Sequence, residues 1–288
     1  MIKFFLGDAM DISELEKKWY SLTIQNNFIF GKTMENNPNL CRRLLEKILR
    51  IKIKSISYPE REKVLESRLD SKGIRLDVYV EDKNGHRSFD VEMQVSDSDN
   101  LAKRMRYYQG LIDMDKLKHG QHYSALGESY IIFICPFDRF KAGKHIYTFK
   151  ETCAECSTII LGDGATKIFL STKGTANDVD EDVKAFLDYV DSGIVSGDFV
   201  SELNEAVQIV KTNQRAVKEF MTFEMILLEN RMAGRAEGIA EGRAEGRAEN
   251  EKTFVLKMLQ KGKTFEEIHE LIEIPIERIK ELANSIRN

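Results

Sequence analysis

The sequence predicts an α/β fold, with a mixed β-sheet flanked by helices and a helical C-terminal extension. Apolar residues alternate with polar ones on both sides of Asn84-Gly85, which is typical of a β-hairpin. Residues 129–136 form a continuous apolar run, as expected of a strand that is buried on both faces. Between these two segments, apolar residues recur at helical spacing within 101–117. The order of hairpin, helix and buried strand indicates a sheet with helices packed against it.

The composition sets limits on the class of protein. A chain of 288 residues is long enough for one large domain, or two smaller ones, with a hydrophobic core. Because the formal net charge is −4, binding to nucleic acid requires local basic patches rather than an overall positive field. No apolar run reaches the roughly 18–20 residues that span a bilayer, so no membrane partner is expected. The first ten residues do not make a convincing signal peptide, and a cytoplasmic protein is expected.

The four cysteines fall into two groups. Cys41 and Cys135 lie in apolar runs and are expected to be buried. Cys153 and Cys156 form a CxxC motif, which alone is weak evidence for zinc because a structural site needs a second pair of ligands. Plain packing and a metal or redox role therefore remain as alternatives for this motif.

Two helical segments are expected before the hairpin. Residues 11–27 form an entry segment, with Trp19 and Tyr20 as anchors. Apolar residues then recur at helical spacing, and Pro38 indicates a break with a new helix starting near Asn39. One face of this helix is cationic, and it is either a solvated surface or a patch that contacts phosphate. The cationic face consists of Arg42, Arg43, Lys47 and Arg50.

Two short segments connect this helix to the hairpin. Residues 51–58, IKIKSISY, alternate strictly between apolar and polar side chains and predict a strand. Residues 59–70 are highly charged and are expected to be irregular.

The hairpin at residues 74–95 contains an unusual pair of acids. Asn84-Gly85 predicts a two-residue turn of type I′, which sets the register of the two strands. In this register Asp77 faces Glu92, and Arg75 faces Gln94, on the side opposite the apolar residues. Directly opposed carboxylates repel each other, but a divalent cation between them turns the repulsion into coordination. The pair therefore predicts a site for a hard cation such as Mg²⁺.

The helix expected at 101–117 brings positive charge close to this pair in sequence. Its first turns carry the basic residues Lys103, Arg104 and Arg106. Tyr107 and Tyr108 either stack on bases or pack against the sheet, and packing is expected for at least one of them. After the buried strand at 129–136, the remaining expected elements are strands at 147–149, 158–161 and 167–170, a helix at 178–190, and a helical region over 200–230.

The composition changes at Gly234, where four tetrapeptides of the type Gly-Arg-Ala-Glu begin. This segment has almost no apolar face, and it is either a solvent-exposed helical spacer or a small-residue stripe for helix association. In the tail, Gly262 ends one helix and Thr264 has the spacing of a capping box for the next. The tail resembles a helix-turn-helix in spacing, and DNA recognition, packing and dimerisation remain alternatives for it.

Three parts of the chain are expected from these patterns. Residues 1–200 form the α/β core, residues 201–250 form a helical region with the repeat as a spacer, and residues 251–288 form a small helical module. A homodimer that associates through the helical C-terminal region is expected.

Together these residues resemble the PD-(D/E)XK nuclease core, the restriction-endonuclease-like fold, and more specifically the Rpn group of recombination-promoting nucleases, which are also described as transposases. The resemblance covers most of residues 20–285. It rests on Arg75–Tyr79 (RLDVY), Val91–Gln94 (VEMQ), Arg104–Gln109 (RMRYYQ), Ile131–Asp138 (IIFICPFD), Phe186–Tyr189 (FLDY) and the glycine-acid repeat before a short helical tail.

The resemblance implies a Mg²⁺-dependent DNA endonuclease that hydrolyses phosphodiester bonds. Asp77 and Glu92 would be catalytic and would ligate Mg²⁺ or Mn²⁺, helped by the Met93 carbonyl. Gln94 stands where the superfamily usually has Lys, and it would orient the attacking water by hydrogen bonds. The DNA substrate would be held by Lys103, Arg104, Arg106 and Tyr107.

The sequence departs from the family pattern at Asn27, where an Asp usually stands. A neutral amide is a poorer metal ligand than a carboxylate, so Glu35 or Glu46 is a candidate for a third carboxylate. The departure also motivates an alternative function, in which the chain is a catalytically impaired module for DNA binding or assembly that keeps the nuclease fold.

Overall fold

The computed structural model describes residues 12–65 and 73–284 and divides the chain into two compact units, residues 1–220 and 221–288. The N-terminal residues on which the expectation about a signal peptide rests, and residues 66–70 of the segment expected to be irregular, lie outside the described residues. None of the described helices is long and apolar enough to cross a membrane.

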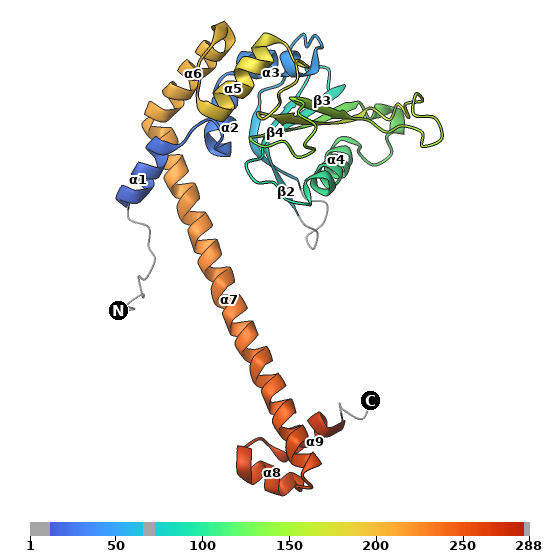
Figure 1. Ribbon diagram of the computed structural model, residues 1–288, viewed down its shortest axis with the longest axis vertical. Coiled ribbons are helices and arrows are strands. Elements are labelled where there is room, and N and C mark those ends of the chain that lie inside the picture. The colour runs from blue at the N-terminus through green and yellow to red at the C-terminus, as the bar shows by residue number, and fades with distance from the viewer. Residues whose placement is uncertain (1–11, 66–72, 285–288) are drawn as a thin grey trace. The chain divides into compact units, whose positions relative to one another are not determined.

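A mixed sheet forms the centre of the first unit (Figure 1). Among the described residues it has six strands, in the order β1-β2-β3-β4-β6-β5. β3 and β4 are parallel, as are β4 and β6, whereas the other neighbouring strands are antiparallel. The strands are β1 (Glu60–Leu65), β2 (Ile74–Glu81), β3 (Arg87–Met93), β4 (Glu128–Cys135), β5 (Ile146–Phe149) and β6 (Ala165–Ser171).

Helices cover both faces of this sheet, which confirms the predicted α/β architecture. One face packs against α1 (Ile12–Ser21), α2 (Asn27–Asn36), α3 (Pro38–Leu49), α5 (Glu181–Ser192) and α6 (Gly197–Thr212). The other face packs against α4 (Leu101–Lys116), and a short 3-10 turn, η1 (Tyr123–Ala125), follows this helix.

Strand β4 is buried on both faces, as its apolar run predicted. Ile132 and Ile134 pack in the core beneath the larger group of helices, whereas Ile131 and Phe133 pack on the side of α4. A strand in this position needs apolar side chains in both directions, which is why its sequence does not alternate.

The hairpin register is as predicted, but the predicted type I′ turn is wrong. Val78 pairs with Val91 and Tyr79 with Asp90, and this register places Asp77 opposite Glu92. The connection is a four-residue loop, residues 83–86, in which Gly85 has a positive φ of 67° and Asn84 does not. The loop is centred on the same position as the expected two-residue turn, so the strand pairing is unchanged.

The strand predicted at 51–58 is also wrong. This segment has only an isolated bridge from Ile56 to Asp82, whereas the charged segment expected to be irregular contains the edge strand β1. Pro59 lies between the two segments, and because proline has no backbone N–H it interrupts the pairing along β2. The charged side chains of β1 suit the edge of a sheet, where they discourage pairing with another strand.

Three smaller expectations need correction. The segment 158–161 is not a strand, since it has only a bridge between Thr152 and Ile160. Tyr20 is exposed and does not anchor α1, although Trp19 is fully buried. Cys156 is exposed, so plain packing does not account for the CxxC motif, whereas Cys41 and Cys135 are buried as expected.

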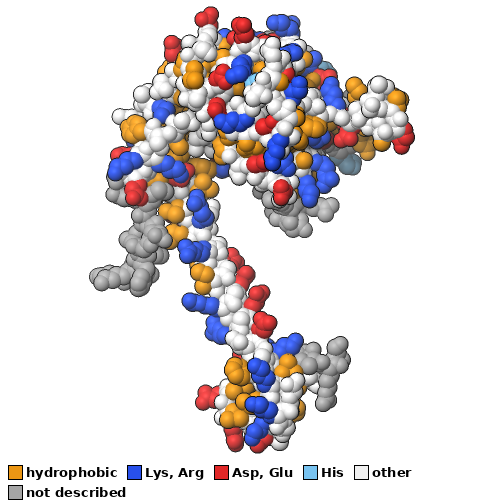
Figure 2. Space-filling view, in the orientation of Figure 1, with side chains coloured by type: hydrophobic (Ala, Val, Ile, Leu, Met, Phe, Trp, Pro, Cys, Tyr) orange, Lys and Arg blue, Asp and Glu red, His pale blue; other side chains and the backbone are white. Residues whose placement is uncertain are grey.

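The second unit consists mainly of one long helix. Helix α7 (Gln214–Gln260) begins in the first unit and contains the whole Gly-Arg-Ala-Glu repeat, whose side chains are largely exposed. Figure 2 shows basic side chains along one side of its exposed stretch and acidic side chains along the other. After Gly262, helices α8 (Phe265–Ile272) and α9 (Ile276–Asn284) pack with the end of α7 around Val255, Ile268 and Ile279. The predicted capping box at Thr264 is present.

Candidate active site

Asp77 and Glu92 lie at the point where β2 and β3 separate. The backbone N–H of Asp77 donates to Oε1 of Glu92 at 2.8 Å, and the backbone N–H of Met93 donates to Oδ2 of Asp77 at 3.1 Å. At this point, therefore, each carboxylate accepts a hydrogen bond from a backbone N–H of the other strand. These two bonds take the place of the backbone-to-backbone bonds that would otherwise join β2 and β3. Both side chains are buried, which fixes their positions.

Asn27 reaches the same carboxylates from another element. It is the first residue of α2, directly after the N-cap Asn26, whose side chain accepts from the backbone N–H groups of Phe28 and Ile29. This cap holds the start of the helix beside β2, and the Asn27 side-chain amide donates to Oδ1 of Asp77 at 3.4 Å. Asn27 therefore occupies the place in the site where a third carboxylate would lie.

Arg104 connects α4 with the two strands. Its guanidinium donates to Oε1 of Gln94 at 2.7 Å and to the Tyr108 hydroxyl at 3.0 Å, and it lies 3.5 Å from Oε2 of Glu92. It also lies over the rings of Tyr108 and Phe133, 5.4 and 5.3 Å from their centroids. A guanidinium held by so many contacts is a fixed positive charge beside the acidic pair.

Asp90 is a third acid on the same face, and the sequence reasoning missed it. It is fully buried, and the carboxyl group of Glu92 is its hydrogen-bonding neighbour. Burial, followed by the negative charges of Glu92 and Asp77, raises the pKa of Asp90 well above its usual range. The neutral, protonated form of Asp90 is therefore favoured more strongly than in an exposed aspartate.

The acidic pair itself is also strained electrostatically. Burial, and then the charge of Asp77, raise the pKa of Glu92 to about 8. Burial likewise raises the pKa of Asp77, although hydrogen bonds from Met93 and Asn27 and the charges of Arg75 and Arg104 oppose the effect. In the metal-free protein, ionising all of these carboxyl groups would place several negative charges close together in a buried site, which is unfavourable. A bound cation removes much of this repulsion.

A hollow of about 500 Å³ opens next to these residues. Its wall includes Asn26, Asn27 and Met93, and it continues to the loop between α1 and α2. Asn27 links this hollow to the acidic pair, because it lines the hollow and its side chain donates to Asp77.

The predicted DNA-contacting residues of α4 divide into two groups. Lys103, Arg106 and Tyr107 are exposed on the surface of the helix, whereas Arg104 is half-buried and points into the site. Tyr108 is buried against Phe133, as expected for at least one of the two tyrosines.

Neither candidate for a third carboxylate on the N-terminal helices makes a recorded contact with Asp77 or Glu92. Glu35 forms ion pairs with Lys32 and Arg61, and Glu46 forms one with Arg42. Both carboxylates are neutralised by these neighbours.

The donor set suits a hard cation with few protein ligands. Within residues 12–65 and 73–284 no group of three or more His, Cys, Asp or Glu side chains is arranged to hold a metal ion. Mg²⁺, however, is commonly bound through one or two carboxylates, together with water and substrate phosphate. Two buried carboxylates that repel each other, with the neutral Asn27 beside them, fit this kind of site.

Comparison with known proteins gives one match. A family model described as PD-(D/E)XK nuclease family transposase matches residues 27–172, which run from Asn27 through the acidic pair, α4 and β4 to the end of β6. No curated protein and no solved structure matches the chain.

Proposed function

The chain belongs to the PD-(D/E)XK nuclease family transposases, and on that premise we propose that it is a Mg²⁺-dependent DNA endonuclease that hydrolyses phosphodiester bonds. The observation that carries this proposal is the buried pair of Asp77 and Glu92, which accept hydrogen bonds from each other's strands beside an open hollow. Two buried carboxylates in register are costly in a purely structural hairpin, and a metal-dependent hydrolase has a use for them.

Asp77 and Glu92 would hold Mg²⁺ or Mn²⁺, and the Met93 carbonyl would be a further oxygen ligand for the ion. The bound ion supplies positive charge to the phosphate oxygens and lowers the pKa of a coordinated water. Asn27 keeps Asp77 oriented by its hydrogen bond to Oδ1, a role that a neutral amide can fill without adding charge.

Gln94 orients the attacking water in this proposal. Its side-chain amide donates to the Ser96 carbonyl, and its Oε1 accepts from Arg104. Because a carbonyl oxygen has two lone pairs, Oε1 still accepts a hydrogen from water. Arg104 then contributes the positive charge that a Lys at position 94 would otherwise bring, and it stabilises negative charge that develops on the phosphate.

The exposed side chains of α4 hold the DNA backbone. Lys103 and Arg106 contact phosphates, which gives affinity without sequence preference, and Tyr107 stacks on a base. These contacts lie on the helix that also presents Arg104, so binding of the backbone brings a phosphate toward the acidic pair.

The proposal is tested by cleavage of supercoiled plasmid. The wild-type chain is expected to nick or linearise the plasmid with Mg²⁺ or Mn²⁺ and to be inactive in EDTA. Asp77→Ala and Glu92→Ala are each expected to abolish cleavage. Full activity of both variants in a clean preparation would show that the assignment is wrong.

Asn27 supports a second candidate function, a DNA-binding or assembly module that has lost catalysis. In that case the site lacks a carboxylate that the chemistry needs. Calorimetric titration with Mn²⁺ separates the two candidates, because the endonuclease binds the ion at Asp77 and Glu92. Binding of DNA without any binding of Mn²⁺ would favour the second function.

A further inference from the structure

The cationic face of α3 is neutralised by acids of the same fold. Arg43 forms an ion pair with Glu202, and Lys47 forms one with Asp182. Arg42 pairs with Glu46 at 2.6 Å. Because the positive charges of these side chains are already paired with acids, they contribute little to the binding of an anionic partner.

The basic residues just beyond α3 are different. Arg50, Lys52 and Lys54 on the loop after the helix, and Lys83 in the β2–β3 loop, are all exposed. Among the described residues, none of the four has a carboxylate within ion-pair distance, and Arg50 donates only to the Asp178 carbonyl, at 3.4 Å.

Backbone hydrogen bonds hold these two loops together. The N–H of Lys83 donates to the Ser55 carbonyl at 3.2 Å, and the N–H of Ser57 donates to the Glu81 carbonyl at 2.7 Å. The positive charges are thus held side by side by the fold, although they repel each other. No compensating acid among the described residues explains why they are gathered here.

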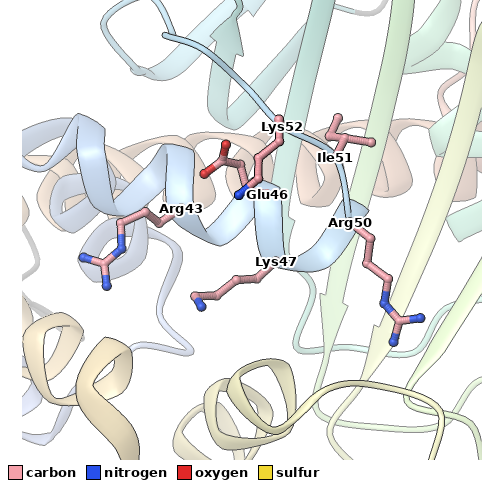
Figure 3. A pocket seen from close by; sticks show the side chains of 6 residues that line it. All are labelled: Arg43, Glu46, Lys47, Arg50, Ile51 and Lys52. Atoms are coloured by element: carbon pink, nitrogen blue, oxygen red, sulfur yellow. The ribbon is translucent and has the colours of Figure 1, made fainter.

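Two hollows lie beside these residues and have Lys52 in common. One, of about 350 Å³, is lined by the end of α3 and by Lys52, and Figure 3 shows the Arg43, Lys47 and Arg50 side chains extending from the same side of the helix. The other, of about 610 Å³, is lined by Lys52, Lys54 and Lys83. Because Lys52 borders both, the hollows form one basic surface, which we call the loop surface.

The acids that line the loop surface are already occupied. Oδ1 of Asp82 accepts from the backbone N–H groups of His86 and Arg87, at 2.9 and 3.2 Å. Glu46 accepts from Arg42 and from the backbone N–H of Ile53. Among the described residues neither acid forms an ion pair with Lys52, Lys54 or Lys83, and the larger hollow is lined by these three lysines and one acid, Asp82.

The loop surface lies at the opposite end of the hairpin from the acidic pair. Asp77 is five residues from Asp82 along β2, and Glu92 is five residues from Arg87 along β3, which corresponds to about 16 Å in each strand. Arg104 and α4 face the acidic pair from the other side of the sheet than α3. The loop surface is therefore separate from the DNA contacts proposed for α4.

We propose that the loop surface binds the phosphate backbone of a second segment of duplex DNA. Lysine ammonium groups on flexible stems suit phosphates in a sequence-independent contact, and no Phe, Tyr or Trp side chain lines either hollow. The chain then holds one segment at the acidic pair and another at the far end of the same hairpin.

Salt-dependent binding of a fluorescein-labelled DNA duplex tests this proposal, with the full chain in EDTA so that no cleavage occurs. The variant is Lys52→Gln with Lys54→Gln and Lys83→Gln, and the matched control is Lys118→Gln with Lys144→Gln and Lys150→Gln, three lysines that are also exposed. At 0.15 M salt the loop variant is expected to bind roughly 10- to 100-fold more weakly than wild type. The slope of log K against log salt is expected to become shallower by about 2.7, or 0.9 for each lost phosphate contact. The control should change neither quantity by more than a small fraction of this.

Equal affinity and slope for the loop variant and the control would overturn the proposal. The single variant Lys83→Glu gives a second measurement, since reversal of one charge should weaken binding without affecting the fold. Because the measurement needs no metal and no turnover, its result is independent of the proposed endonuclease activity. The loop variant can bind DNA more weakly than wild type even if the wild type never cuts DNA. Equally, it can bind as tightly as a wild type that does cut DNA.

Discussion

The side-chain amide of Asn27 donates to Oδ1 of Asp77 at 3.4 Å, across fifty residues of sequence. Asn27 is the first residue of α2, and the adjacent Asn26 caps the helix, so the backbone from which the Asn27 side chain reaches Asp77 is held in place. Asn27 thus contacts the acidic pair directly, and its amide supplies a hydrogen bond where an Asp at this position would supply a charge.

Replacing Asn27 by Asp is expected to strengthen metal binding. A third carboxylate beside Asp77 adds a hard ligand, and the concentration of Mg²⁺ that gives half-maximal cleavage should fall roughly 3- to 10-fold. In EDTA the same variant should melt at a lower temperature than wild type, because another negative charge joins a buried acidic group. Asn26→Asp is the matched control, since Asp caps a helix as well as Asn does and adds the same charge one residue away. An unchanged Mg²⁺ requirement in Asn27→Asp would show that this position does not reach the ion.

Arg104→Gln is expected to reduce catalysis far more than binding. The variant loses the charge beside Glu92 and the hydrogen bonds to Gln94 and Tyr108, and kcat should fall roughly 10²- to 10³-fold. Arg106→Gln, on the exposed side of the same helix, should instead raise KM and leave kcat nearly unchanged. Steady-state cleavage of an oligonucleotide substrate separates the two effects. The account of Arg104 is contradicted if both variants raise KM alone.

The stability of the metal-free protein is expected to fall as the pH rises from about 5 to about 8. The native state keeps a proton on Glu92, whose pKa burial raises to about 8, whereas the unfolded chain loses that proton near pH 4.5. The native state therefore binds more protons in this window, and a rise in pH favours unfolding. Glu92→Gln should make the decline in melting temperature smaller, whereas Glu60→Gln, at an exposed acid of β1, should not.

Divalent metal should reverse this trend. The carboxylates must lose their protons to bind the ion, so the increase in melting temperature on addition of Mg²⁺ should be larger at pH 8 than at pH 6. A melting temperature that does not respond to Mg²⁺ or Mn²⁺ at pH 8 would show that the acidic pair is not a metal site.

Helix α7 is expected to associate with a second copy of the chain. Met225, Met232 and Ile239 recur every seven residues and are 53%, 51% and 47% exposed, so they place an apolar side chain at one of the two seam positions in three successive heptads. Light scattering should give twice the chain mass for wild type and the single mass for Met232→Lys with Ile239→Lys. Asn230→Lys with Ala248→Lys, on the opposite side of the helix, is the control and should stay dimeric. A single-chain mass for the wild type would show that the predicted dimer does not form.

The alternation of apolar and polar residues predicted most strands, and the helical spacing of apolar residues predicted most helices, because both patterns reflect which side chains of an element are buried. The register of Asp77 and Glu92 follows from the centre of the β2–β3 loop, and it holds even though the turn type differs. The loop type could not be predicted because it depends on contacts from elsewhere, including the bond from the Lys83 N–H to Ser55. Residues 51–58 alternate as a strand does, but Pro59 removes the donor that would continue their pairing with β2.

The site was predicted in part, for a similar reason. Ser88, Asp90, Glu92 and Gln94 are a polar series with a period of two, and this pattern was the available signal for Asp90. That Asp90 is fully buried beside Glu92 depends on α4 covering this face, which local sequence does not reveal. The contacts of Arg104 with Gln94 and Glu92 likewise depend on how α4 packs against the sheet.

The rate of plasmid nicking by Asp77→Asn, measured at saturating Mg²⁺, tests the central claim most directly. This substitution keeps the shape of the side chain and removes the charge that would hold the ion. Glu60→Gln is the matched control, since it removes an exposed carboxylate from the neighbouring strand. The account predicts that Asp77→Asn loses at least roughly 10³-fold in rate while Glu60→Gln retains the wild-type rate. Equal rates for the two variants would contradict it.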